Sequence, residues 1–184
     1  MYKNLLCLFL LSRGRVLSAV FAIQDFYWRD YAHGFVPKDA FEGKPGIYIG
    51  QVYYNGHGLI PATVYPYRNA AVMVYDTRQN MKENIKILCN SDTSKFYWQG
   101  QMAYAIRGGF QDDQNLFIGL VKHEGSWKIG KVKDIDAYEN KGLYVWDKAG
   151  NHVKFTNFHL LKYNFSNTPS SDPYAYDIRN LAIH

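Results

Sequence analysis

The chain has 184 residues, 47% of them hydrophobic and 17% aromatic, and its formal net charge at pH 7 is +5. This length suits one compact domain or two small intertwined ones, and no stretch approaches the roughly 18 apolar residues of a membrane helix, so we expect no integral membrane insertion. Three basic residues and no acid lie in the first 22 residues; the remainder carries only 18 − 16 = +2 without a Lys/Arg cluster, which argues against a nucleic-acid partner.

Residues 1–22 combine the parts of a secretory signal peptide. Lys3 provides a positively charged start, LLCLFLL is a short apolar run, and Ala22 closes a small-residue cleavage site. Arg13 and Arg15 place two charges inside the apolar centre, which instead suits an irregular leader on an intracellular protein. We therefore expect a secreted protein, with a cytoplasmic or vesicle-associated location as the alternative.

The segment that follows contains an internal repeat. The triplet FYW begins at Phe26 and again at Phe96, an offset of 96 − 26 = 70 residues. Four further matches keep the same order with offsets between 68 and 73, as in a repeat with small loop insertions. They are IYIGQV at Ile47 with LFIGLV at Leu116, LIPATV ending at Val64 with KIGKV ending at Val132, VMVYD at Val72 with LYVWD at Leu143, and ENIKILCN with TNFHLLKYN, which aligns Leu88 with Leu161. We place the first repeat at residues 23–95 and the second at residues 96–163.

Each repeat is predicted to consist of short strands. IYIGQVYY and LFIGLVKH combine β-branched and aromatic residues and run into glycine-containing turns. AAVMVY and GLYVWDKAGNHVKF alternate apolar positions around a hairpin turn, so the pattern indicates an antiparallel all-β architecture. A unit of about 70 residues buries only part of its sheet surface. We therefore expect the two repeats to share one core with approximate twofold pseudo-symmetry, which places Trp28 and Trp98 at equivalent core positions.

Several other features are expected to be structural. Cys89 is the only cysteine outside the leader, so no intrachain disulfide is predicted, and its apolar setting favours a buried thiol. Residues 164–184 turn polar and contain prolines, so we expect an extension, in which Asn164 begins a glycosylation sequon if the chain is secreted. The glycines expected to serve backbone geometry rather than ligand contact are Gly108, Gly109, Gly119 and Gly130.

The motifs of the two repeats, in their order, resemble the DM9 repeat. The second copy has Trp98, AIRGG at residues 105–109, LFIG at 116–119, IGKV at 129–132 and FHLL at 158–161. The first copy has Trp28, VPKDAFEG at residues 36–43, IYIG at 47–50 and LIPATV at 59–64. The resemblance covers about residues 26–163 and implies a small all-β protein of tandem DM9 repeats, of the kind found in insects and other invertebrates. Some members of the family are mannose-binding, lectin-like proteins of innate defence, so the resemblance implies carbohydrate recognition.

The resemblance also implies a sugar site in the second repeat. Sugar-binding members use the lysine of a Gly-Lys pair, which is Lys131 here, and an acidic residue after a Gly-aromatic step. This acidic position falls on Gln111 or Asp112, depending on a one-residue gap, and we choose Asp112 with Asp113 as its neighbour. A carboxylate accepts hydrogen bonds from adjacent sugar hydroxyls, and an ammonium donates to their oxygens. The residues expected to complete the pocket are Glu124 or His123.

The first repeat departs from this pattern. Ala62 and Thr63 replace the Gly-Lys pair, and the acidic candidate is only Glu42. A sugar site there has lost its cation, so we expect it to be weak or absent. Self-association into a homodimer would then supply a second site and the avidity that two sites allow.

No motif of catalysis or metal binding is present. The six histidines show neither the spacing of zinc ligands nor a cysteine cluster, and nucleophile elbows, phosphate loops and dinucleotide glycine patterns are missing. We therefore expect no enzyme, metal or cofactor. The main hypothesis is a mannose-type recognition protein, and the alternative is a protein-interaction scaffold without sugar binding. A second-repeat pocket occluded by its own side chains would favour the scaffold.

Overall fold

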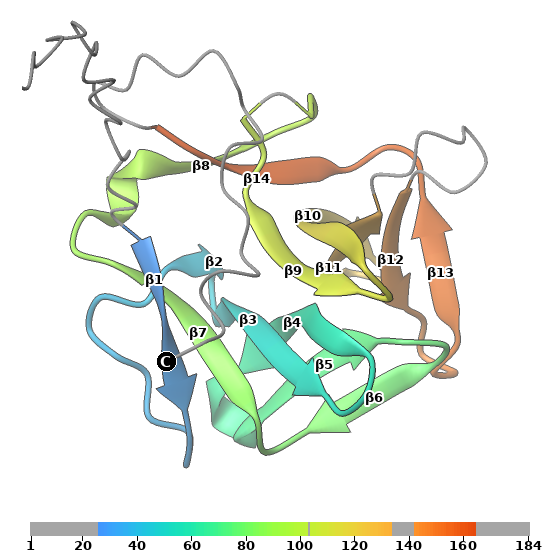
Figure 1. Cartoon of the computed structure of the whole chain (residues 1–184), viewed down its shortest axis with the longest axis horizontal. Coiled ribbons are helices and arrows are strands. Elements are labelled where there is room, and N and C mark those ends of the chain that lie inside the picture. Colours follow the sequence, from blue (N-terminus) through green and yellow to red (C-terminus); the bar gives the residue numbers. More distant parts are fainter. Residues whose placement is uncertain (1–25, 103, 134–141, 165–184) are drawn as a thin grey trace, which may run out of the picture.

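The computed structural model describes residues 26–102, 104–133 and 142–164 (Figure 1). The signal peptide predicted at residues 1–22 lies outside these residues, as does all but Asn164 of the tail predicted at residues 164–184. Within them the chain forms 14 strands and two short 3-10 helices, η1 (Pro66–Arg68) and η2 (Thr93–Lys95), but no α-helix. The all-β prediction is therefore confirmed.

The strands all join in one antiparallel sheet. They are β1 (Phe26–Tyr31), β2 (Glu42–Lys44), β3 (Ile47–Tyr54), β4 (Gly58–Tyr65), β5 (Ala70–Val74), β6 (Arg78–Met81), β7 (Ile85–Asn90), β8 (Phe96–Gln99), β9 (Arg107–Gln111), β10 (Gln114–His123), β11 (Ser126–Lys133), β12 (Gly142–Trp146), β13 (His152–Phe155) and β14 (His159–Tyr163). Strands such as β3, β5 and β10 follow apolar runs of the sequence, whereas β2 and β6 are polar.

The strand pairings fall into two corresponding sets. In the first set β3–β4, β4–β5 and β5–β6 pair in succession, while β7 returns to lie between β1 and β3. In the second set β10–β11, β11–β12 and β12–β13 pair in succession, and β14 pairs with both β8 and β10. Trp28 faces Leu88 in the first set, as Trp98 faces Leu161 in the second. The twofold pseudo-symmetry between the sets stays a prediction.

One strand register refines the alignment of the two repeats. Val64 faces Ala71 across β4 and β5, and Val132 faces Leu143 across β11 and β12. Ala71 and Leu143 therefore correspond, with an offset of 143 − 71 = 72, whereas the sequence comparison aligned Val72 with Leu143. The one-residue difference matters because neighbouring residues of a strand point to opposite faces.

A core built from both sets holds the sheet together. One buried cluster combines Ile49 and Leu88 of the first set with Ile118 and Leu161 of the second. Trp28 and Trp98 both pack against this cluster and are partly buried, as the sequence predicted for core aromatics. Apolar side chains from the two sets thus leave water together, which is the main free-energy gain of folding.

Cys89 lies in a second buried cluster and has no exposed surface. Burial raises the pKa of its thiol to about 11, because the charged thiolate would lose its hydration. The prediction of a buried thiol is confirmed.

Strand β9 joins the two sets, because it lies between β4 of the first and β10 of the second (Figure 1). The backbones approach so closely that a Cβ atom on Gly109 would lie 2.0 Å from the carbonyl oxygen of Leu59, and one on Gly58 would lie 2.3 Å from that of Phe110. Glycine is the residue that permits such an approach. The prediction that Gly109 serves backbone geometry is thus supported.

We expect Gly109→Ala to lower the free energy of unfolding by about 2–4 kcal/mol, because β9 must move away from β4 to admit the methyl group. Urea unfolding followed by tryptophan fluorescence measures the change. Gly100→Ala is the matched control, because the nearest atom to its added Cβ is the Phe158 carbonyl oxygen at 3.8 Å. The control should change stability by less than about 0.5 kcal/mol; equal losses in both variants would show that the close approach is unimportant.

Candidate functional site

Lys131 lies in the middle of the molecule, on β11, between Ile118 of β10 and Tyr144 of β12. Only 2% of its surface is exposed. Its ammonium donates to Gln111 Oε1 at 2.6 Å and to the Tyr75 carbonyl oxygen at 3.3 Å. Nζ also lies 5.3 Å from the centre of the Tyr75 ring, within the range of a cation–π contact. The charge is buried but has partners, which is the condition under which proteins keep a charge inside.

Gln111 links this buried cation to an exposed acid. Its amide Nε2 donates to Asp112 Oδ2 at 3.0 Å, while its Oε1 accepts from Lys131. Asp112 and Asp113 form the two-residue loop between β9 and β10, since Gln111 faces Gln114 across the hairpin. Both aspartates have positive φ, 49° and 62°, as this tight hairpin requires. The turn therefore fixes the Asp112 carboxylate beside Gln111.

Burial and neighbouring charges set the protonation of Lys131. Burial is the largest cause that lowers the pKa of its ammonium, which falls from the ordinary 10.5 to about 8. The positive charge of Lys133 lowers this pKa further, whereas Asp76 and Asp112 raise it. Lys131 and Asp112 thus interact through both the Gln111 bridge and their charges, so the structure brings together three of the residues predicted for the sugar site.

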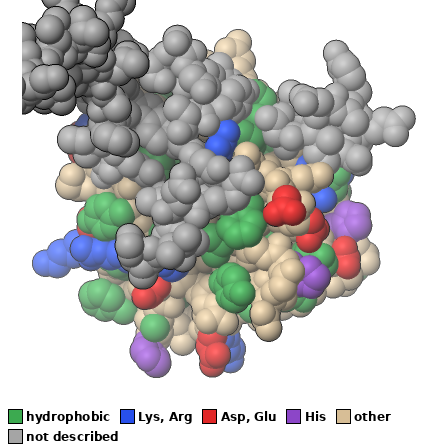
Figure 2. Space-filling model, viewed as in Figure 1, with side chains coloured by type: hydrophobic (Ala, Val, Ile, Leu, Met, Phe, Trp, Pro, Cys, Tyr) green, Lys and Arg blue, Asp and Glu red, His purple; other side chains and the backbone are tan. Residues whose placement is uncertain are grey.

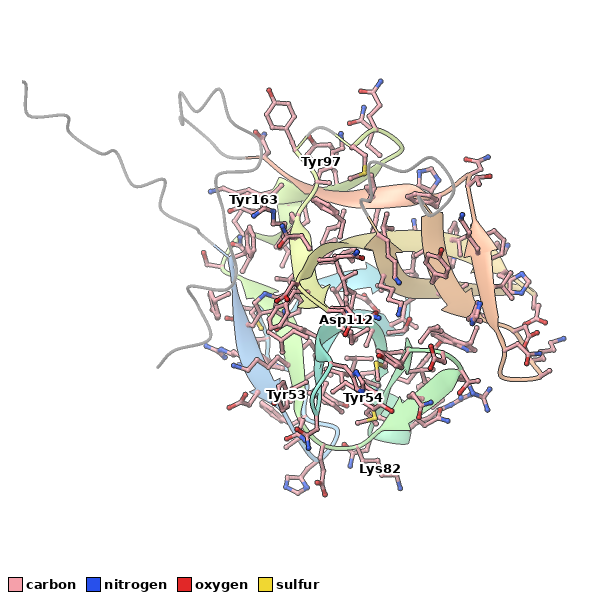
Figure 3. The ribbon with its side chains drawn as sticks, turned by 45° about the vertical axis from the view of Figure 1, so that its right-hand side comes forward. Tyr53, Tyr54, Lys82, Tyr97, Asp112 and Tyr163 are labelled. Atoms are coloured by element: carbon pink, nitrogen blue, oxygen red, sulfur yellow. The ribbon has the colours of Figure 1, made fainter. Side chains whose placement is uncertain are left out.

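Three rings from the first set of strands adjoin this group. The Tyr75 hydroxyl and His57 Nδ1 are 2.8 Å apart, and the ring centres of Tyr54 and His57 lie 5.3 Å apart in a stacked arrangement. Tyr54 also lies 5.2 Å from Tyr75, whose carbonyl oxygen accepts from Lys131. Figure 3 labels Asp112, at the turn between β9 and β10, and Tyr54, at the end of β3, which β4 separates from β9 in the sheet. We call the complete group the seam cluster, formed by Tyr54, His57, Tyr75, Gln111, Asp112 and Lys131.

The aromatic members of the seam cluster were not singled out in the sequence. His57 belongs to the turn NGHG and Tyr75 to the repeated segment VMVYD, so both occur in segments whose composition already fits a turn or a strand. Their proximity to Lys131 arises because the end of β5 packs against β11, a contact between residues 56 positions apart. No local spacing signals such a contact.

Glu124 and His123 contact other partners than the seam cluster, and their part in a sugar pocket stays a prediction. Glu124 accepts from Lys128 Nζ at 3.1 Å and from the Lys148 backbone N–H at 3.2 Å, and its carboxylate lies 3.8 Å from His123 Nε2. Lys128 and Lys131 are three residues apart on β11, so they point to opposite faces. The residues opposite them on β10 confirm this. Val121 faces Lys128 and Ile118 faces Lys131, and Val121 and Ile118 belong to different buried clusters.

The Glu124 carboxylate is held by its own partners. Backbone and side-chain hydrogen bonds from Lys148 and Lys128 outweigh the opposing effect of desolvation and lower the pKa of this acid. The surrounding charges are thus already matched, and we assign the Glu124–Lys128 pair a structural role in the β10–β11 hairpin.

The first repeat has a hydroxyl where the second has its lysine. Thr63 corresponds to Lys131, with an offset of 131 − 63 = 68. It is fully buried, and its Oγ1 donates to the Ile129 carbonyl oxygen and accepts from the Ile129 N–H, both at 2.8 Å. Thr63 therefore ties β4 to β11 and presents no charge. Glu42, the acidic candidate of the first repeat, accepts a hydrogen bond from the Gly46 N–H at 2.7 Å in a surface turn.

The described residues also bear on a membrane span and on a metal site. In that part of the chain, no helix is long and apolar enough to cross a bilayer. The same residues contain no group of three or more His, Cys, Asp or Glu side chains placed to hold a metal ion. On the face seen in Figure 2, basic side chains are scattered and acidic ones lie among them.

Comparison with protein families gives one match. The model of the DM9 repeat family matches residues 42–145, which are 145 − 42 + 1 = 104 of the 184 residues. This range contains all six residues of the seam cluster. No curated protein matches the sequence.

The pKa of Lys131 predicts how stability depends on pH. Its folded value of about 8 lies below the ordinary 10.5, so between these pH values the unfolded chain binds more protons than the folded one. The contribution of Lys131 to the free energy of unfolding therefore rises with pH. Between pH 7 and pH 10, we expect the wild type to gain about 2 kcal/mol in free energy of unfolding relative to Lys131→Met.

Urea unfolding at several pH values measures this difference, and other titrating groups cancel because both proteins contain them. Lys122→Met, on the exposed side of β10, is the matched control for the loss of a lysine at the surface. A flat profile for Lys131→Met would mean that the ammonium does not bear a burial penalty.

Proposed function

Because the chain belongs to the DM9 repeat family, we propose that it is a non-enzymatic recognition protein that binds mannose-type carbohydrates at the seam cluster. The observation that carries the proposal is the chain of contacts from buried Lys131 through Gln111 to exposed Asp112. It holds the Asp112 carboxylate in a fixed position at the surface with the buried Gln111 amide behind it, and carbohydrate sites depend on such preorganised polar groups.

Asp112 is the group proposed to touch the sugar. Its carboxylate is at the surface and accepts from two adjacent hydroxyls, while the rings of Tyr54 and His57 pack against the apolar face of the pyranose. Lys131 has the role of a positioning residue. Its ammonium is covered, so it orients Gln111 and adds positive charge behind the site instead of donating directly to the sugar.

The covered position of Lys131 also supports the second candidate function. Gln111 and Tyr75 already use the ammonium, so Lys131 is closed to a ligand, and this occlusion of one predicted site residue supports a scaffold. In that case the seam cluster is a polar joint between the two sets of strands, and the surface contacts a protein partner. A homodimer belongs to the sugar function, because the first repeat lacks the lysine of the second and only self-association would supply a second site.

We expect Asp112→Ala to weaken binding to mannose-containing glycans at least tenfold, since a charged hydrogen bond contributes about 1.5–3 kcal/mol. Glycan-array binding followed by isothermal titration calorimetry measures the loss. Glu124→Gln is the matched control, because it alters an acid outside the seam cluster and should leave the affinity unchanged. An empty array at high concentration of wild-type protein would reject the sugar function and favour the scaffold.

We further propose that the protein is secreted and acts in innate defence. Amino-terminal sequencing of native protein should find Ile23 as the first residue, because signal peptidase would cut after Ala22. Recovery of the intact leader would instead support a cytoplasmic or vesicle-associated protein.

A further inference from the structure

The strand register brings His57 next to Asp112. His57 is half-buried and ends the turn between β3 and β4, directly before Gly58. Gly58 faces Gln111 in the antiparallel pairing of β4 with β9. Continuing this register by one residue places His57 opposite Asp112, and Cβ atoms of opposite residues in such a pair are about 4.5–5.5 Å apart.

The surroundings of Tyr75 agree with this placement. The Tyr75 hydroxyl and His57 Nδ1 are 2.8 Å apart. Desolvation is the largest cause that raises the pKa of Tyr75, and the charge of Asp112 is the largest contribution from a neighbouring group. His57 and Asp112 therefore lie beside the same tyrosine, and the exposed Asp112 is open to a ligand.

The contacts of His57 fix the direction of its ring. The His57 backbone N–H donates to the Tyr54 carbonyl oxygen at 2.9 Å, and the ring lies against Tyr54 and Tyr75 with centres 5.3 and 4.3 Å away. Because Nδ1 meets the Tyr75 hydroxyl, Nε2 lies on the opposite edge of the ring. Nε2 has no hydrogen-bond partner within the described part of the chain and, unlike the Tyr31 hydroxyl, it is not buried.

The chemistry of Nε2 suits a hydroxyl group. If the Tyr75 hydroxyl donates to Nδ1, Nε2 carries the ring proton and donates; in the other tautomer Nε2 accepts. A ligand hydroxyl satisfies both cases, because it donates and accepts. The Asp112 carboxylate accepts from a second hydroxyl. Two protein groups so close together reach neighbouring hydroxyls of one sugar ring, not hydroxyls on its opposite sides.

We propose that His57 is a specificity-determining residue of the seam cluster, whose Nε2 binds one sugar hydroxyl while the Asp112 carboxylate binds the adjacent one. This inference rests on the sugar function proposed above and narrows the ligand to sugars with a free vicinal diol. Tyr75 is a positioning residue, because its hydroxyl holds Nδ1 and thereby turns Nε2 outward.

NMR titration of the full chain with methyl α-D-mannopyranoside and its monodeoxy analogues tests this pairing. In the wild type, we expect two analogues that lack adjacent hydroxyls to bind more weakly than the parent sugar. The loss is at least tenfold for the hydroxyl at Asp112 and about three- to tenfold for the hydroxyl at His57. His57→Phe keeps a ring beside Tyr54; it should weaken the parent sugar about three- to tenfold and abolish the loss for one analogue. Asp112→Ala should abolish the loss for the other.

Two further variants complete the test. Tyr75→Phe leaves every atom of His57 in place and should reduce the same loss that His57→Phe abolishes, which keeps the test decisive if His57→Phe fails to fold. His159→Phe alters an exposed histidine of β14 outside the seam cluster and should leave all affinities unchanged.

The outcomes separate this inference from the function on which it rests. Binding by the wild type with the same losses in His57→Phe and Tyr75→Phe would overturn the role of His57 and leave the sugar function standing. Losses at two hydroxyls that are not adjacent would overturn the vicinal diol. No binding of any of these sugars by the wild type would reject the sugar function itself.

Discussion

The close contact between β9 and β4 is the constraint on which the rest of the structure depends. Gly109 lets the two backbones approach until no side chain fits between them, and β9 thereby joins the first set of strands to the second. The same strand ends in the hairpin that carries Gln111 and Asp112. The position of these two side chains over Lys131 is therefore a consequence of the joint, and the candidate site lies where the two sets meet.

Lys131 shows how such a joint can contain a charge. An isolated ammonium in a protein interior is very costly, but here one partner comes from each set, Gln111 from the second and the Tyr75 carbonyl from the first. Thr63, at the corresponding place in the first repeat, ties the same two sets with neutral hydrogen bonds to Ile129. Corresponding positions thus both connect the sets, but only Lys131 adds a charge.

The sequence predicted much of this architecture and part of the site. Alternating apolar runs and glycine turns predicted the strands, and the offset between Trp28 and Trp98 predicted their matched places in the core. The choice of Asp112 and Lys131 brought together residues that do lie close in space. Glu124 instead pairs with Lys128, because sequence distance from Lys131 does not reveal on which face of β11 a side chain finds its partner.

The sequence by itself determined the properties that depend on nearby residues. These are the strand periodicity, the repeat, the hairpin turn at Asp112 and Asp113, and the residue types available for chemistry. Only the tertiary structure decided that Tyr75 covers Lys131 and that His57 lies against Tyr75. These contacts join residues far apart in the chain. Their energies depend on how strands pack face to face, which local patterns do not encode.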